Sequence, residues 1–67
     1  MNLKKTTKAA IEKYGEELCI RAVMLNERDG EGASTIACYL GLPGVKQADA
    51  AINAGRELAT VRGVKVR

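Results

Sequence analysis

Residues 34–44 read STIACYLGLPG and predict a sharp corner between two helices. A short apolar helix begins at Gly32 or Ser34 and ends just before Gly41. Gly41 is the expected left-handed terminator, because glycine lacks the Cβ that penalises a positive φ. Pro43 suits the first turn of the next helix, where its missing N–H costs nothing.

The helix that follows the corner is expected to run to about Thr60. Its apolar residues recur at helical spacing. They predict an inner face formed by Val45, Ala48, Ile52, Gly55 and Ala59, with Ala51 and Leu58 alongside. The opposite face then presents Lys46, Ala50, Asn53 and Glu57, with Gln47 and Asp49 at its edges.

Residues 7–26 also have a helical pattern, and Thr6 or Thr7 is placed to cap its start. One apolar stripe is made by Ile11, Tyr14, Leu18, Ala22 and Leu25. Gly15 lies on this stripe and has two interpretations: it permits close packing, or it splits the span into two shorter helices. Glycine inside a helix costs about 1 kcal/mol relative to alanine, which keeps the split open.

Length and composition favour one small helical domain. The chain has 67 residues and is 46% hydrophobic, with no Trp or Phe and two Tyr. We expect an all-α fold of three or four helices over residues 1–60, followed by a basic tail over residues 61–67. The valines of the tail, Val61, Val64 and Val66, suit a short strand, a small hairpin or an extended arm that becomes ordered on something else.

A domain of this size buries only about 60% of its unfolded surface and is marginal without a partner. Ile20 and Met24 lie one turn apart on the side opposite the apolar stripe. We therefore expect a homodimer through the outer face of this first long helix, with Val23 at the edge of the contact. The same two side chains would alternatively dock another protein.

The sequence offers no set of residues for catalysis or metal binding. Histidine is absent, and Cys19 and Cys38 match no metal or redox spacing. Two buried free thiols are expected, with a single disulfide as the alternative. We predict no enzyme activity, no metal and no cofactor. No signal peptide or membrane span is apparent, and we expect a cytoplasmic protein.

Charge is distributed unevenly along the chain. The net charge is +3, made up of +3 over residues 1–13, −3 over residues 14–32 and +3 over residues 33–67. Two basic ends therefore flank an acidic middle. That pattern suits termini that touch phosphate, and it equally suits solvated charge with no partner.

The heptapeptide Ile36–Leu42 resembles the first helix and turn of bacterial and phage helix-turn-helix regulators, in the form IAxxLGL. The resemblance covers these residues only. It implies that the helix after Pro43 reads bases in the major groove of double-stranded DNA. On that basis, the candidate DNA-binding residues are Lys46, Gln47 and Asn53 for base edges or phosphate, and Arg62 and Lys65 for phosphate.

Two functions follow as hypotheses. The first is a small DNA-binding regulator of bacterial or phage type. The second is a non-catalytic protein-interaction module, such as a phage-type inhibitor or adaptor, that does not touch DNA. Salt separates them, because phosphate contacts release counterions and DNA binding weakens steeply as salt rises.

Overall fold

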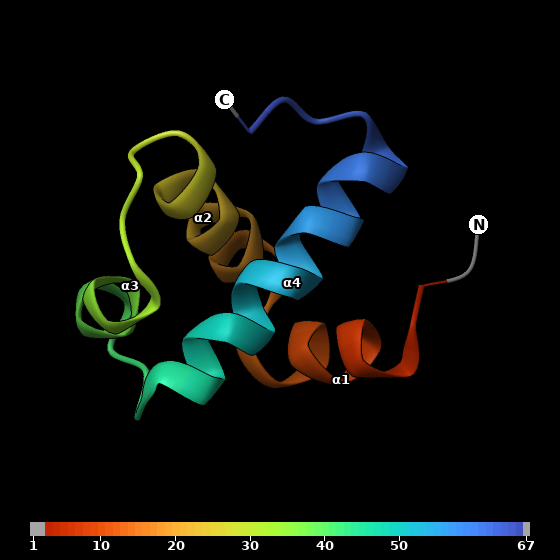
Figure 1. Cartoon of the computed structure of the whole chain (residues 1–67). Helices are drawn as coiled ribbons and strands as arrows, with labels where there is room; N and C mark the ends of the chain where they lie inside the picture. Colours follow the sequence, from red (N-terminus) through yellow and green to blue (C-terminus); the bar gives the residue numbers. More distant parts are fainter. Residues whose placement is uncertain (1–2, 67) are drawn as a thin grey trace.

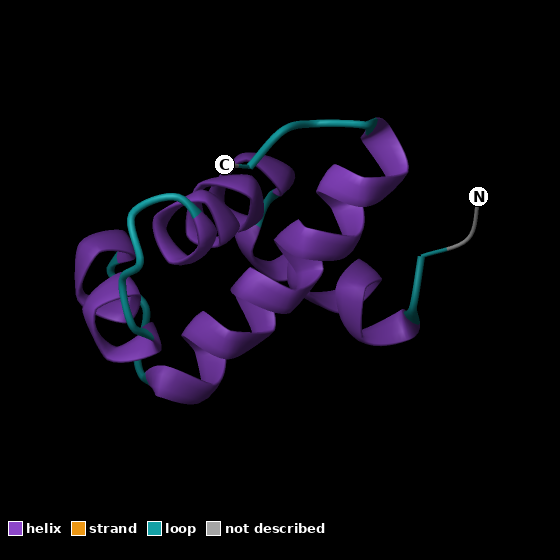
Figure 2. Cartoon of the chain, turned by 45° about the horizontal axis from the view of Figure 1, so that its top comes forward, coloured by secondary structure: helices purple, strands orange, loops and turns teal. Residues whose placement is uncertain are grey.

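The computed structural model describes residues 3–66, and Met1, Asn2 and Arg67 lie outside the described part. It confirms the all-α fold, and no strand occurs in residues 3–66. Four helices follow one another along the chain (Figures 1 and 2): α1 Lys5–Tyr14, α2 Glu16–Glu27, α3 Ala33–Leu40 and α4 Val45–Arg62. None of these helices is long and apolar enough to cross a bilayer.

Helix α4 is the centre of the domain. It crosses the molecule diagonally in Figure 1, and α1, α2 and α3 each pack against it. The period of small and apolar residues along α4 explains this role. The buried positions of α4 are Ala48, Ala51, Ile52, Ala54, Gly55, Leu58 and Ala59. The expected inner face is therefore confirmed except at Val45, which is 49% exposed because it is the first residue of the helix.

Gly15 splits the N-terminal span into two helices. Its φ is 91°, a region that favours glycine, and its N–H donates to the carbonyl of Ile11 at 2.7 Å. Lys4 is the N-cap of α1, and no side chain caps this helix, so the expected cap by Thr6 or Thr7 is wrong. Thr7 instead is buried, within the first turns of α1.

The corner after α3 forms where the sequence places it. Gly32 is the N-cap of α3, and Gly41 ends the helix in the left-handed region with φ 68°. The Leu42 N–H closes the last turn on the carbonyl of Ala37 at 2.8 Å. Pro43 lies before the N-cap residue Gly44 rather than inside the first turn of α4, because the connection is longer than the sequence suggests.

Helices α2 and α4 form the closest helix–helix packing of the domain. A Cβ at Gly55 would fall 2.6 Å from the carbonyl carbon of Cys19 and closer still to its oxygen. The same Cβ would lie 3.1 Å from Cγ1 of Val23. The backbones of α2 and α4 therefore touch at Gly55, and no other residue type fits there unless the helices separate.

The two cysteines differ in exposure, and the tail begins later than expected. Cys19 is buried and Cys38 is exposed, both as free thiols, so the expectation of two buried thiols is wrong for Cys38. Burial raises the pKa of the Cys19 thiol. Helix α4 continues to Arg62, two residues beyond the expected end, and Val66 folds back to pack against the core.

Candidate nucleic-acid interface

One face of α4 is left uncovered by the other helices. Its exposed residues are Lys46, Asp49, Ala50, Asn53, Arg56 and Thr60. Lys46, Asn53 and Thr60 are seven residues apart, so they lie in one row along the helix, with about 10.5 Å between neighbours. The row exists because the opposite positions are the small and apolar residues that pack against the rest of the bundle.

The N-terminal part of α1 borders this face and forms a groove with it. The groove has a volume of about 570 Å³ and is lined by Lys4, Thr6, Thr7, Asn53, Arg56, Glu57, Thr60 and Val61. A second hollow of about 340 Å³ adjoins it and is lined by Thr6, Thr7, Lys46, Asp49, Ala50, Asn53 and Ala54. Asn53 and the two threonines line both. We call the two together the α1–α4 groove.

Glu57 fixes α1 to the floor of this groove. One of its carboxylate oxygens, Oε1, accepts a hydrogen bond from the backbone N–H of Lys4 at 2.9 Å. This hydrogen bond, with a second from the side chain of Thr7, lowers the pKa of Glu57 below its usual range. The N-terminus of α1 thus already holds an anion of the chain itself, so a bound phosphate would have to use lysine side chains instead.

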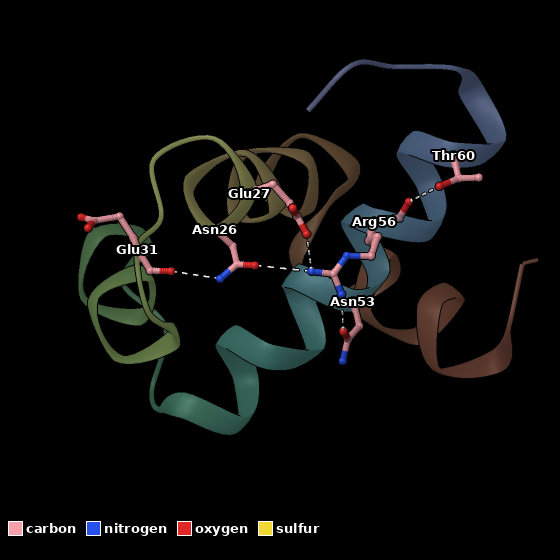
Figure 3. A network of polar contacts seen from close by, with 6 residues as sticks. All are labelled: Asn26, Glu27, Glu31, Asn53, Arg56 and Thr60. Atoms are coloured by element: carbon pink, nitrogen blue, oxygen red, sulfur yellow. Dashed lines mark hydrogen bonds and ion pairs between the residues drawn. The ribbon is translucent and has the colours of Figure 1, made fainter. Parts of the chain in front are cut away.

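A polar network fixes the other border of the α4 face (Figure 3). Nη2 of Arg56 pairs with Oε1 of Glu27 at 2.8 Å and lies 3.4 Å from Oδ1 of Asn26. Asn26 in turn donates to the carbonyl of Glu31 at 3.0 Å. The network therefore ties α4 to the end of α2 and to the loop that follows it.

Asn53 stands beside this network. Its Oδ1 is 3.5 Å from Nη1 of Arg56, at the limit of a hydrogen bond, and Figure 3 shows its amide nitrogen directed away from the guanidinium. The weak contact leaves both the donor and the acceptor of Asn53 able to face a ligand. Arg56 is a residue of this face that was not predicted, although its position three residues after Asn53 places it on the same side of the helix.

The structure brings only some of the predicted DNA-binding residues together. Lys46 and Asn53 share the uncovered face of α4. Gln47 is half-buried, with its amide oxygen beside Gly44. Arg62 is about 24 Å along α4 from Lys46 and about 160° around it, by helix geometry. Its Nη2 is bound by Oε2 of Glu16 at 2.7 Å. Lys65 is exposed in the tail.

The predicted dimer residues also need correction. Val23 is fully buried, so it cannot lie at the edge of an outer contact. It points toward α4 together with Cys19 and Ala22, because the break at Gly15 gives α2 a direction independent of α1. Ile20 and Met24 are half-buried rather than exposed.

Electrostatics of the α1–α4 groove combine both signs. Lys4, Lys46 and Arg56 line it with Asp49 and Glu57. Glu57 is held by α1 and Arg56 by Glu27, which leaves Lys46 and Asp49 as the charges of the α4 face with no ion pair within residues 3–66. In the same part of the chain, no three Cys, Asp or Glu side chains gather in a way that could hold a metal ion.

Comparison of the chain with protein-family models, with curated proteins and with solved structures found no match.

Proposed function

We propose that this protein binds double-stranded DNA by placing the uncovered face of α4 in the major groove. The observation that carries the proposal is the free face itself. Three helices cover α4 on its other sides, and the remaining side presents polar and small residues near its N-terminal end. An α-helix is about as wide as the major groove of B-DNA, so a face free of other elements is a requirement for this mode of binding.

The spacing and chemistry of the face suit base edges. Lys46 and Asn53 are about 10.5 Å apart along the helix, which matches about three base-pair steps of 3.4 Å. Lysine can donate to the guanine acceptors, and asparagine can pair with adenine through its donor and acceptor together. Between them, Asp49 can accept from the cytosine amino group and Ala50 can contact a thymine methyl.

The phosphate contacts in this proposal come from α1. Lys4, the N-cap residue of α1, lines the α1–α4 groove, and Lys5 and Lys8 are exposed in the first turn of the helix. Arg62 is less suited, because it is paired with Glu16 and lies on the other side of α4. Lys65 remains available as a contact from the tail. The proposal thus keeps the N-terminal lysines and Lys65 on phosphate and leaves Arg62 outside the contact.

A fluorescence-polarisation titration of labelled mixed-sequence duplex at several salt concentrations tests the proposal. Four phosphate contacts, from the three N-terminal lysines of the proposal and Lys65, predict a slope of log affinity against log salt of about −3.6. Lys46→Glu and Asn53→Ala should lower affinity while the circular-dichroism melt stays nearly unchanged. Arg28→Glu is the matched control, because it makes the same charge change at an exposed residue after α2.

Two results would refute DNA binding through α4. One is the absence of any affinity at low salt. The other is a loss of affinity in Lys46→Glu no larger than in Arg28→Glu. Either result would favour the competing proposal, a non-catalytic protein-interaction module. The carboxylates of Asp49 and Glu57 in the α1–α4 groove suit that proposal, because they repel phosphate.

A further inference from the structure

A second groove lies where the ends of α1 and α3 meet the start of α2. It has a volume of about 500 Å³ and is lined by Tyr14, Gly15, Glu17, Leu18, Arg21, Tyr39 and Leu40. Both tyrosines of the chain line it, and Tyr39 is 67% exposed. The ammonium of Lys13 lies 5.5 Å from the ring centroid of Tyr14 and flanks the groove. We call it the Tyr39 groove.

Neither tyrosine belongs to the buried core, and both line this groove. The largest fully buried side chains are Ile36, Val23 and Cys19. A tyrosine that is two-thirds exposed, together with two half-buried leucines, gives the groove an apolar part beside its charged residues. Tyrosine and arginine are also the residue types that dominate the energetics of protein interfaces.

Charges on α2 determine what fits the groove. Cys19 and Val23 face α4, so helix geometry places Glu17 and Arg21 on the opposite side of α2. Both are exposed, they are one turn apart, and neither has an ion-pair partner within residues 3–66. The α2 side of the Tyr39 groove therefore carries one free negative and one free positive charge, about 6 Å apart along the helix.

We infer that the Tyr39 groove is a self-association face, occupied by a second copy of this chain with the two α2 helices antiparallel. A two-fold axis between Glu17 and Arg21 brings Arg21 of each copy opposite Glu17 of the other, which forms two ion pairs. A parallel arrangement would bring like charges together and is disfavoured. Each Tyr39 then lies on the same edge of the paired helices as the Tyr39 of the other copy. The dimer buries the edges of both grooves and so removes them from water.

This face differs from the one that the sequence suggested. Val23 is buried and makes no part of it, and its centre is Glu17, Arg21 and Tyr39. The uncovered face of α4 is on the far side of the domain from the outer side of α2, so association does not depend on DNA binding. A standard interface covers about 800 Å² per partner, and the Tyr39 groove presents a smaller surface than that. We therefore expect weak association, with a dissociation constant of about 10–100 μM.

Sedimentation equilibrium of the full chain up to about 300 μM tests the inference. The unmodified chain should associate to a dimer. Arg21→Glu and Glu17→Arg should each raise the dissociation constant at least about tenfold, because each leaves like charges opposed across the axis. The double variant, which exchanges the two charges, should return it to near the original value. Lys46→Glu is the control and should leave it unchanged.

Tyr39→Ser should also weaken the dimer. At concentrations well below the dissociation constant, where the chain is monomeric, the thermal melt of this variant should stay close to that of the unmodified chain. A monomer at the highest concentration would overturn the inference. A dimer that Arg21→Glu and Tyr39→Ser leave intact, or a double variant that fails to restore association, would overturn it as well. Because these variants lie outside the α1–α4 groove, a failure here leaves the DNA titration unaffected.

Discussion

Gly55→Ala is expected to destabilise the fold, although alanine is the better helix former. An added Cβ would meet the backbone of Cys19 at 2.6 Å from its carbonyl carbon, and Cγ1 of Val23 at 3.1 Å. A side chain could turn aside, but the backbone of α2 cannot, so α2 and α4 must move apart. Overpacking of this kind costs about 1–3 kcal/mol and occasionally more.

The helix-propensity gain of about 1 kcal/mol opposes this cost. The contact is to backbone, at the most intimate crossing of the domain, so we place the cost at or above the upper end of that range. The net loss of unfolding free energy is then at least about 2 kcal/mol. For a domain of this size, each kcal/mol lowers the melting temperature by about 4–8 °C, which predicts a drop of at least about 8 °C.

Urea denaturation followed by far-UV circular dichroism measures the change. Ala50→Gly is the control, because Ala50 is exposed on the same helix and reports propensity alone, at about 1 kcal/mol. A Gly55→Ala variant as stable as the unmodified chain, or more stable, would show that the two backbones do not touch there.

Gly41→Val should destabilise the domain by about 1–2 kcal/mol in the same urea assay, because φ at Gly41 is 68°. Nothing lies within 4 Å of an added Cβ, so the whole effect is backbone strain. An unchanged urea midpoint would argue against the left-handed corner. Glu57→Gln should lower the urea midpoint at neutral pH, because the carboxylate accepts hydrogen bonds from Lys4 and Thr7. The pKa of Glu57 is lowered in the folded protein, so its stabilisation is present above the ordinary glutamate pKa and is lost as the pH falls through the folded value. The difference in stability between the Glu57→Gln variant and the unmodified chain should therefore shrink in acid, and a difference that stays constant with pH would contradict this role.

Local signals in the sequence were enough to predict the corner and most of α4. The end of a short apolar helix followed by glycine favours the left-handed conformation at that glycine whatever surrounds it, and Gly41 adopts that conformation. The buried face of α4 follows from its period, because one helix of constant direction keeps its residues in phase. These features depend on neighbours within a turn or two of the chain, which the sequence displays directly.

The outer surface of α2 could not be predicted in the same way. The helical stripe drawn through Gly15 assumes one axis, and the break there gives α2 a separate one. Val23 therefore turned out to be buried, while Glu17 and Arg21 define the outer side. Gly15 left both a continuous and a broken helix open, and its φ of 91° in the folded chain decides for the break.

For the α1–α4 groove, the sequence identified Lys46 and Asn53 on one helix face but not the segment that lies beside them. The hydrogen bond between Lys4 and Glu57 joins residues 53 positions apart, and the pair of Arg56 with Glu27 joins residues 29 positions apart. Contacts over such separations depend on the tertiary arrangement. Likewise, the ion pair that occupies Arg62 becomes visible only once α2 and α4 are placed side by side.

The central position of α4 has a consequence for how this chain folds as it is synthesised. Helices α1, α2 and α3 emerge from the ribosome first, yet the surface that each of them buries is provided mainly by α4. Until α4 has been made, side chains such as Val23 and Ile36 have little to cover them, and isolated helices of these lengths are marginal in water. Folding should therefore be late and cooperative. A nascent chain stalled before Val45 would expose the future core and become a substrate for chaperones and proteases.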